Sequence, residues 1–449
     1  MEGEDTRRTT AGNRDGKQTR TPSEFGGTGR RDAFDRNATG EFQFDQVVRR
    51  GETTISRSVE WSSERSTTTD EASSEGRTTF ISDGGVDAPD SSRASADAGI
   101  DAEPETQSGT SSSDVETERT APIAPTDDSR RAHARWYAQV GGPVETSPVV
   151  RDGSVYVGTE NGFVCRIDRR DGVSDWLFQA ANAVGSPVPG PELTYVGDRN
   201  GNLFALDGAS GAREWTFEAD AGVEVSPVLL GDTLYVAARD GQVSALDAVT
   251  GEQTASFRSP ARALTSVRIA GGSLYATGLD GGLFAHDLDG GDERFRFAPS
   301  LAIAGAPAVI GDTAYVGTVD GDRIYALDAE TGEMEWRYEA DDGIWSSPAV
   351  GDGIVYVGCA DGSVLALDAR DGAVRWRVQT GARVWGSPVV TDELVYVCND
   401  DGLLLALDRA DGRLRWHFRA HDSLVGAPAV GSDAIYVGDV AGTVYALPP

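Results

Sequence analysis

The stretch SPAVGDGIVYVGCADGSVLALDARDGAVRW, from Ser347 to Trp376, decides the fold because its pattern recurs along the chain. Eight copies begin with Ser or Ala, and the anchor positions at the copy ends are 39 to 41 residues apart. The anchors are Trp136, Trp176, Trp215, Ala255, Phe295, Trp336, Trp376 and Trp416. Self-similarity at this period indicates a repeat architecture.

Each copy has the pattern of four short strands. In the copy that begins at Ser347, these are a short apolar start, the alternating run IVYVG, the run VLALD and the segment that ends near Trp376. A glycine separates the second and third runs in all eight copies, and Asn or Asp precedes it in seven. Asn-Gly and Asp-Gly are typical of tight hairpins. We therefore predict an all-β fold, an eight-bladed β-propeller with four-stranded blades.

The first and last copies predict how the ring closes. The last copy ends at Val444–Pro449 without a fourth strand, whereas Trp136 belongs to a fourth strand with no copy before it. We expect the N-terminal strand to complete the C-terminal blade, so that no sheet keeps an open edge there. We also expect the large aromatic anchors to be structural, packed between blades. These anchors are Trp136, Trp176, Trp215, Phe295, Trp336, Trp376 and Trp416.

The chain divides into two regions of different composition. Residues 1–131 are rich in Ser, Thr, Gly, Arg and Asp and poor in aliphatic residues, which predicts a disordered tail. Residues 132–449 form the predicted propeller. Within the tail, Glu41 to Trp61 alternates weakly, as a marginal hairpin or docking motif would, but we interpret it as a stickier part of the disordered tail.

The charge of the chain is strongly acidic. The formal net charge is −32, and Lys17 is the one lysine among 40 basic residues. This composition favours a protein adapted to molar salt over an ordinary acidic protein, and it argues against nucleic acid as a partner. No apolar run approaches the roughly 18 residues of a membrane span, and no signal peptide or lipobox precedes the repeats. We therefore expect a cytoplasmic protein.

The string ALDAETGEMEW, from Ala326 to Trp336, resembles the tryptophan-docking motif of quinoprotein-type propellers. That group includes dehydrogenases dependent on the quinone PQQ and the non-enzymatic assembly protein BamB. The resemblance covers residues 136–449 and implies the fold rather than a cofactor. The sequence departs from the motif at Ala255 and Phe295, and at Arg166, where the other copies have Ala.

An enzyme of this family is implied to need features that the chain lacks. The dehydrogenases carry an adjacent cysteine pair under the quinone, calcium ligands and long insertions between blades. Here the cysteines are Cys165, Cys359 and Cys398, and the copies vary in length by one residue. We predict a non-enzyme with no cofactor, no metal site and no catalytic residue.

One position in the repeat predicts a binding site. Two residues before the Ser or Ala start, the copies carry different residues, including Glu145, Glu224, Trp345 and Trp385. In such a propeller these residues are expected on the inner rim of the central funnel. The tryptophans either plug the channel or form an aromatic patch for an extended segment with apolar and arginine side chains. Arg-rich pieces of the tail, such as VVRRG from Val47, are candidate competitors.

The most favoured function is a non-catalytic scaffold, present as a monomer, that binds another protein. The first alternative is a quinone-dependent dehydrogenase. The second is a sensor of small molecules or glycans, which requires an aromatic-lined pocket in the funnel. A fold alone does not choose among them.

Overall fold

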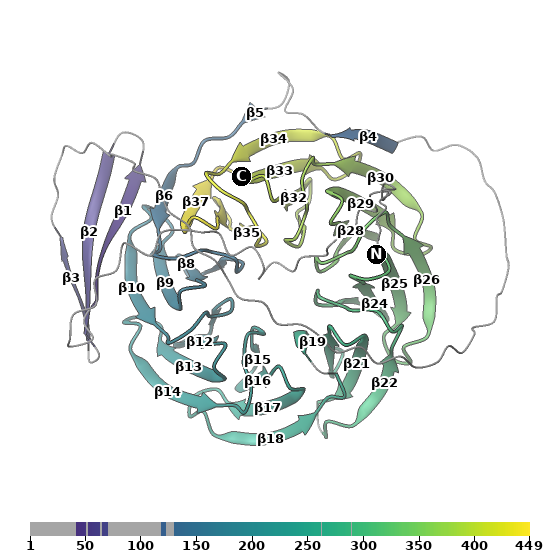
Figure 1. Cartoon of the computed structure of the whole chain (residues 1–449), viewed down its shortest axis with the longest axis horizontal. Helices are drawn as coiled ribbons and strands as arrows, with labels where there is room; N and C mark the ends of the chain where they lie inside the picture. The colour runs from purple at the N-terminus through teal and green to yellow at the C-terminus, as the bar shows by residue number, and fades with distance from the viewer. Residues whose placement is uncertain are drawn as a thin grey trace, which may run out of the picture.

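The chain forms a closed ring of eight β-sheets around a central axis, as Figure 1 shows. The computed structural model describes residues 132–261, 263–288 and 290–449 with their side chains, and the backbone of five strands that precede them. No helix occurs in this described part, so none in it is long and apolar enough to cross a membrane. The prediction of an eight-bladed propeller with four-stranded blades is confirmed.

Each blade is an antiparallel sheet whose strands follow one another from the inside of the ring outward. Blade 1 consists of β7 (Val149–Arg151), β8 (Ser154–Gly158), β9 (Phe163–Asp168) and β10 (Ser174–Gln179). Blade 2 consists of β11 (Val188–Pro189), β12 (Leu193–Gly197), β13 (Asn202–Asp207) and β14 (Arg213–Glu218). Blade 3 consists of β15 (Val228–Leu230), β16 (Thr233–Ala237), β17 (Gln242–Asp247) and β18 (Gln253–Arg258). Blade 4 consists of β19 (Leu264–Ala270), β20 (Ser273–Gly278), β21 (Gly282–Asp287) and β22 (Glu293–Phe297).

The second half of the ring repeats this order. Blade 5 consists of β23 (Ala308–Ile310), β24 (Thr313–Gly317), β25 (Arg323–Asp328) and β26 (Met334–Glu339). Blade 6 consists of β27 (Ala349–Gly351), β28 (Ile354–Gly358), β29 (Ser363–Asp368) and β30 (Val374–Gln379). Blade 7 consists of β31 (Val389–Val390), β32 (Leu394–Cys398), β33 (Leu403–Asp408) and β34 (Leu414–Arg419). Blade 8 combines β35 (Ala429–Val430), β36 (Ile435–Gly438) and β37 (Thr443–Leu447) with β6 (Trp136–Gln139).

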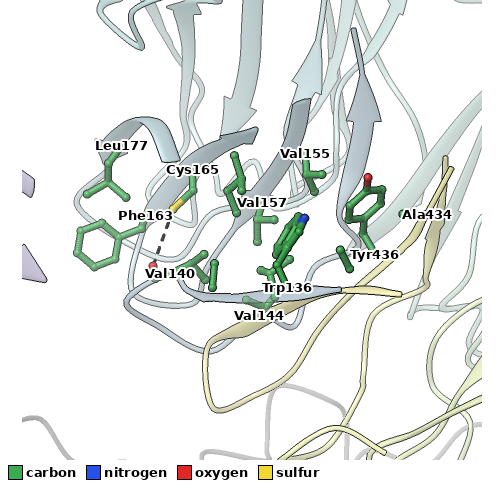
Figure 2. Close-up of a cluster of buried hydrophobic side chains, with 14 residues drawn as sticks. Trp136, Val140, Val144, Val155, Val157, Phe163, Cys165, Leu177, Ala434 and Tyr436 are labelled. Carbon is green, nitrogen blue, oxygen red and sulfur yellow. Dashed lines mark hydrogen bonds between the residues drawn. The ribbon is translucent and has the colours of Figure 1, made fainter. Parts of the chain in front are cut away.

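The predicted closure is confirmed in blade 8. Strand β6 pairs antiparallel with β37, so that Trp136 lies opposite Ala446 and Ala138 lies opposite Val444. Trp136 is 1% exposed, and its indole N–H donates to the carbonyl of Arg169 at 2.9 Å. Figure 2 shows this ring beside Tyr436 in the core between blades 8 and 1. The ring of sheets is therefore joined by the first strand of the repeat region.

Five strands before the propeller extend its outer edges. They are β1 (Phe42–Arg50), β2 (Thr53–Ser62), β3 (Arg65–Asp70), β4 (Glu118–Pro122) and β5 (Arg130–Arg131). Strand β1 pairs with β2 and with β6, whereas β4 and β5 pair in parallel with β30 and β34. Of the two interpretations of Glu41 to Trp61, the hairpin is the one seen in the backbone. The rest of the predicted disordered tail lies outside the described residues.

The anchor tryptophans pack against the next blade. The ring of Trp376 is 1% exposed, and a Cβ added to Gly412 in blade 7 would lie 2.8 Å from it. Gly412 has φ 69°, a conformation that side chains other than glycine rarely adopt. The indole N–H of Trp376 donates to the carbonyl of Arg409 at 3.0 Å. The tryptophan of one blade thus packs directly on the glycine of the Asp-x-x-x-Gly loop in the next blade.

Blade 3 replaces its missing tryptophan with a nearby phenylalanine. At the anchor position stands Ala255, which is exposed. Phe257, two residues later on the same strand face, packs where a tryptophan ring lies elsewhere, and a Cβ on Gly291 would be 2.5 Å from it. His286 of blade 4 packs beside Phe257 at 5.1 Å between ring centroids, and burial lowers the pKa of this histidine. The repeat alignment did not predict this substitution.

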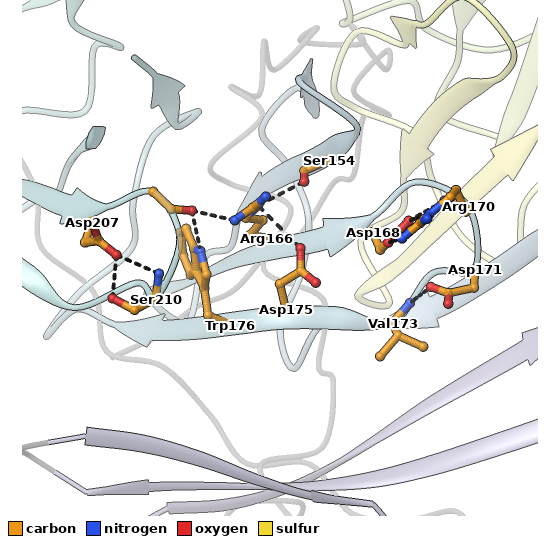
Figure 3. A network of polar contacts seen from close by, with 11 residues as sticks. Ser154, Arg166, Asp168, Arg170, Asp171, Val173, Asp175, Trp176, Asp207 and Ser210 are labelled. Atoms are coloured by element: carbon orange, nitrogen blue, oxygen red, sulfur yellow. Dashed lines mark hydrogen bonds and ion pairs between the residues drawn. The ribbon is translucent and has the colours of Figure 1, made fainter. Parts of the chain in front are cut away.

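Arg166, the other departure from the motif, bridges two blades. Its Nη1 donates to the carbonyl of Gly208 at 2.6 Å, the same carbonyl that accepts from the indole of Trp176 at 3.1 Å. Its Nε donates to Ser154 Oγ at 2.9 Å and lies 3.4 Å from Asp175. Figure 3 shows this guanidinium between its partners. A charged side chain is therefore accommodated where the other copies have Ala.

Candidate functional site

The segments expected at the rim of the central channel come from two parts of each blade. One is the segment that enters the innermost strand, and the other is the turn between the second and third strands. Hydrogen bonds join the entry segment of one blade to the turn of the preceding blade. The Val384 N–H donates to the carbonyl of Cys359 at 3.2 Å, and the Val144 N–H donates to the carbonyl of Asp439 at 3.1 Å. These bonds hold the entry segments beside the turns that contain the glycine.

Trp345 and Trp385 lie together on this rim. They enter the adjacent blades 6 and 7, and their ring centroids are 5.4 Å apart at an interplanar angle of 82°. Trp385 is 7% exposed, whereas Trp345 is partly exposed. The guanidinium of Arg383 lies 5.9 Å from the centroid of Trp385. This edge-to-face pair presents aromatic surface, with a cation at its border, to whatever approaches the channel.

Glu224 belongs to a chain of ion pairs that crosses three blades. Arg199 Nη1 lies 2.8 Å from Glu160, and its Nε lies 3.7 Å from Glu224. Arg239 Nη1 lies 3.2 Å from Glu224. The side chains in this chain are 24% to 58% exposed, so each pair is solvent-screened and contributes little to stability. Its effect is to fix the positions of alternating charges at the rim of blades 1 to 3.

Glu145 lies beside this chain of ion pairs in blade 1. Its pKa is raised to about 7, mainly because the carboxyl is buried from water and next because the Glu160 carboxylate repels its charge. Arg199 acts in the opposite direction and lowers the pKa. The carboxyl is thus neutral below pH 7 and charged above it. A cation placed next to Glu145 would favour the charged form.

The structure brings together the predicted rim residues in two separate groups. Glu145 and Glu224 belong to a charged arc on blades 1 to 3, which also contains Glu160, Arg199 and Arg239. The tryptophans belong to an apolar arc that also contains turn or entry residues of blades 4 to 6, namely Leu279, Ala304, Val319 and Ala360. The turn residues of both arcs were missed. These turn residues stand two places before the turn glycine that all eight copies share. Their identity varies from copy to copy, and this variation is the signal that could have identified them from the sequence.

Blade 2 departs from the alignment by one residue. Val184 N–H donates to the carbonyl of Thr159 at 3.3 Å, as Val144 N–H does to Asp439. Val184 stands two residues before Ser186, as Glu145 does before Ser147, so the sequence aligns it with Glu145. In the structure it is instead the buried counterpart of Val144. The repeat of 39 residues between Trp176 and Trp215 is consistent with this shorter entry.

The residues for other chemistry are dispersed. Cys165, Cys359 and Cys398 are free and buried in three different cores, and burial raises the pKa of each thiol. Among residues 132–449 as described, no three His, Cys, Asp or Glu side chains are grouped so that they could hold a metal ion. An adjacent cysteine pair of the dehydrogenase type therefore has no counterpart in these cores.

VVRRG from Val47 lies elsewhere than the rim in this structure. Val48 and Arg49 of β1 are paired with Ala138 and Tyr137 of β6, on the outer edge of blade 8. The proposed competition of this stretch for the tryptophans is therefore not favoured by its position.

Comparisons with known proteins agree with the propeller. The solved structure of BamB from Moraxella catarrhalis matches with a TM-score of 0.62 and 18% identity, over 71% of this chain and 100% of that one. The computationally designed protein Ika8 matches with a TM-score of 0.60 and 17% identity, over 72% and 98%. Quinohemoprotein alcohol dehydrogenase from Comamonas testosteroni matches with a TM-score of 0.60 and 16% identity, over 71% and 76%. No curated protein matches the chain.

A family model gives the more specific result. The model described as outer membrane protein assembly factor BamB matches residues 128–191, 181–294, 256–347 and 340–449. These overlapping matches cover the whole propeller and more than half of the chain. The chain belongs to the BamB-type family of PQQ-like β-propellers.

Proposed function

We propose that the protein is a non-catalytic scaffold whose channel rim binds an extended segment of another protein. The observation that carries this proposal is the pair of Trp345 and Trp385, held edge to face at the rim with Trp345 partly exposed. Partly exposed aromatic residues at the centre of a surface are typical of binding hot spots. Membership of the BamB-type family supports the same function class.

The two arcs of the rim define the chemistry of the segment. An apolar or aromatic side chain fits against the tryptophans, and Arg383 at their border adds a positive charge that suits a carboxylate or carbonyl there. Two blades further around the ring from Trp385, at the entry to blade 1, Glu145 is the acidic residue beside the ion pairs, and it gains its charge when a cation approaches. A segment with an apolar residue and an arginine separated by a few extended residues matches both arcs.

The double variant Trp345→Ala, Trp385→Ala is expected to weaken this binding at least tenfold, or about 1.4 kcal/mol. The measurement is fluorescence anisotropy with short labelled peptides that carry one Leu and one Arg in a Gly-Ser sequence. A matched control is Val249→Ala, which removes an exposed apolar side chain on a turn away from the rim. Unchanged affinity in the double variant would contradict the proposal, and early melting would show that the tryptophans only plug the channel.

The pH gives a second measurement on the same complex. Because the pKa of Glu145 is about 7, binding of an arginine has to displace a proton at pH 6 but not at pH 8. We expect affinity to rise from pH 6 to pH 8 and this rise to disappear in Glu145→Gln. Peptides with Gln in place of Arg serve as the control and should show no such dependence.

Quinone-dependent oxidation is the alternative function, favoured by the structural similarity to the Comamonas testosteroni enzyme. The residues fit the quinone poorly, since the three thiols lie in separate cores. We expect added PQQ and calcium to yield no stoichiometric bound chromophore and no dye-linked oxidation of alcohols. A one-to-one complex in a spectrophotometric titration would favour the enzyme instead.

A further inference from the structure

The outermost strands of seven blades carry a charge next to the anchor. The residue before the anchor is Arg135, Asp175, Glu214, Arg294, Glu335, Arg375 or Arg415 in those blades. In blade 3 it is Thr254, and the run Gln253 to Phe257 in β18 contains no charged residue. Charged side chains on edge strands oppose pairing with the edge of another sheet. Blade 3 therefore lacks the charge that the other blades carry at this position, although it keeps the bulge at Thr254.

Among the strands that the structure describes, none pairs with the outer edge of blade 3. Strands β1, β4 and β5 of the same chain cover the outer strands of blades 8, 6 and 7. On β18, by contrast, Thr254, Ala255 and Ser256 are all exposed. Because Ala255 replaces an anchor tryptophan, this strand also presents little side-chain bulk. The backbone of β18 is thus accessible to a further strand.

Two exposed apolar side chains lie on turns of blade 3, one of them in the turn that leads into this edge. Val249, in the turn that leads into β18, is 69% exposed, and Leu230 is 50% exposed. The two turns are adjacent, because Ala248 N–H donates to the carbonyl of Asp232 at 2.9 Å. Two of the five large apolar side chains exposed in the described part of the chain therefore lie on blade 3.

We propose that β18 pairs with β18 of a second copy, antiparallel and around a twofold axis at Ala255. This register places Thr254 opposite Ser256 of the second copy and Gln253 opposite Phe257. It also brings Glu252, the residue before the strand, towards Arg258 of the second copy, whose guanidinium lies 2.9 Å from Asp240 of its own blade, so that opposite charges meet at both ends of the strand pair. Complementarity of this strand with itself is the reason to choose a second copy as the occupant. The same arrangement at β22 would oppose Arg294 to Arg296 of the other copy.

The charge of the chain sets the conditions for this contact. Each copy carries a net charge of −32, so two copies repel each other in dilute buffer. The Debye length falls from about 10 Å at 0.1 M salt to about 3 Å at 1 M, which removes most of this repulsion. A pair of short strands is a small interface and binds weakly. We therefore expect a reversible dimer that forms in molar KCl and dissociates on dilution.

Sedimentation equilibrium of the full chain in molar KCl measures this dimer. Thr254→Lys gives blade 3 the charge that the other blades have, and it is expected to raise the dimer Kd at least tenfold. Thr216→Lys is the matched control, since it adds the same charge to an exposed residue of β14 in the neighbouring blade. It should leave the Kd unchanged.

Crosslinking tests the register itself. In the proposed pairing Ala255 faces its own copy at the roughly 4.5–5.5 Å between Cα atoms of antiparallel partners, which is within disulfide range. Ala255→Cys is expected to form a covalent dimer on mild oxidation, and Thr216→Cys is not. A chain that stays monomeric in molar KCl at high concentration would overturn the proposal. So would a dimer that Thr254→Lys leaves intact, because it would use another surface.

Discussion

A chain that begins at Pro143 is expected to lose the folded propeller, whereas one that begins at Ala132 is expected to keep it. The shorter chain lacks β6, which supplies the outermost strand of blade 8 and pairs with β37. Without it Trp136 no longer fills the core between blades 8 and 1, and the edge of β37 is left open. An unpaired edge of this kind promotes aggregation. Circular dichroism melting and light scattering of the two chains measure the difference.

The longer chain also loses β1 to β5, which provides the control for this prediction. Of these strands, β1, β4 and β5 pair with the outer edges of blades 8, 6 and 7, and β2 and β3 extend the sheet beyond β1. Their loss is expected to lower the melting temperature slightly, since β6 remains. Equal stability of the two chains would mean that β6 is not needed to complete blade 8 and that the ring is closed by other contacts.

The repeat alone predicts most of this fold, because each copy encodes the same local contacts. Strand order, the packing of the tryptophan anchors between blades and the closure through Trp136 all follow from a pattern that recurs about every 40 residues. The exceptions are positions where one copy departs from the pattern. Phe257, two residues after Ala255, fills the space against Gly291 where the other blades have the anchor ring. This substitution depends on packing between blades and is not visible in the motif.

Segments outside the repeat were harder to predict. The stretch from Phe42 to Ser62 has only weak alternation, and its pairing with β6 depends on an edge that exists only once the ring has closed. Similarly, β4 and β5 are short, and their pairing with β30 and β34 joins residues more than 200 positions apart. A single sequence contains no local signal for such long-range contacts.

The candidate site was predicted in part. The aligned entry position identified Trp345, Trp385, Glu145 and Glu224 as rim residues, because the frame around that position is constant. It could not show that Arg199 links Glu160 to Glu224, since these residues belong to three different blades. The division of the rim into a charged and an apolar arc follows from this spatial order, which one repeat does not contain.

Trp376→Ala is expected to lower the free energy of unfolding by about 3–5 kcal/mol, the range for removal of a large buried aromatic residue. Trp376 is 1% exposed. Its ring packs against Tyr356, with 5.7 Å between the ring centroids, and against Gly412 of the next blade. Trp416→Ala is the control within the same motif. Because Trp416 is only partly buried, its replacement should lower the free energy of unfolding by less. Urea unfolding in molar KCl, monitored by circular dichroism, compares the two variants.

The glycine on which the ring rests gives an independent measurement of the same contact. Gly412 and Gly353 have similar φ values of 69° and 73°, so alanine meets a similar backbone penalty at both positions. A Cβ at Gly353 has nothing within 4 Å, whereas at Gly412 it lies 2.8 Å from the Trp376 ring. Gly412→Ala should therefore destabilise the protein clearly more than Gly353→Ala, and the excess should shrink when Trp376 is already alanine, which leaves the contact of the added Cβ with Val378 at 2.9 Å. Equal effects of the two glycine substitutions would mean that the tryptophan does not depend on this seat, and that backbone conformation alone explains the recurring glycine.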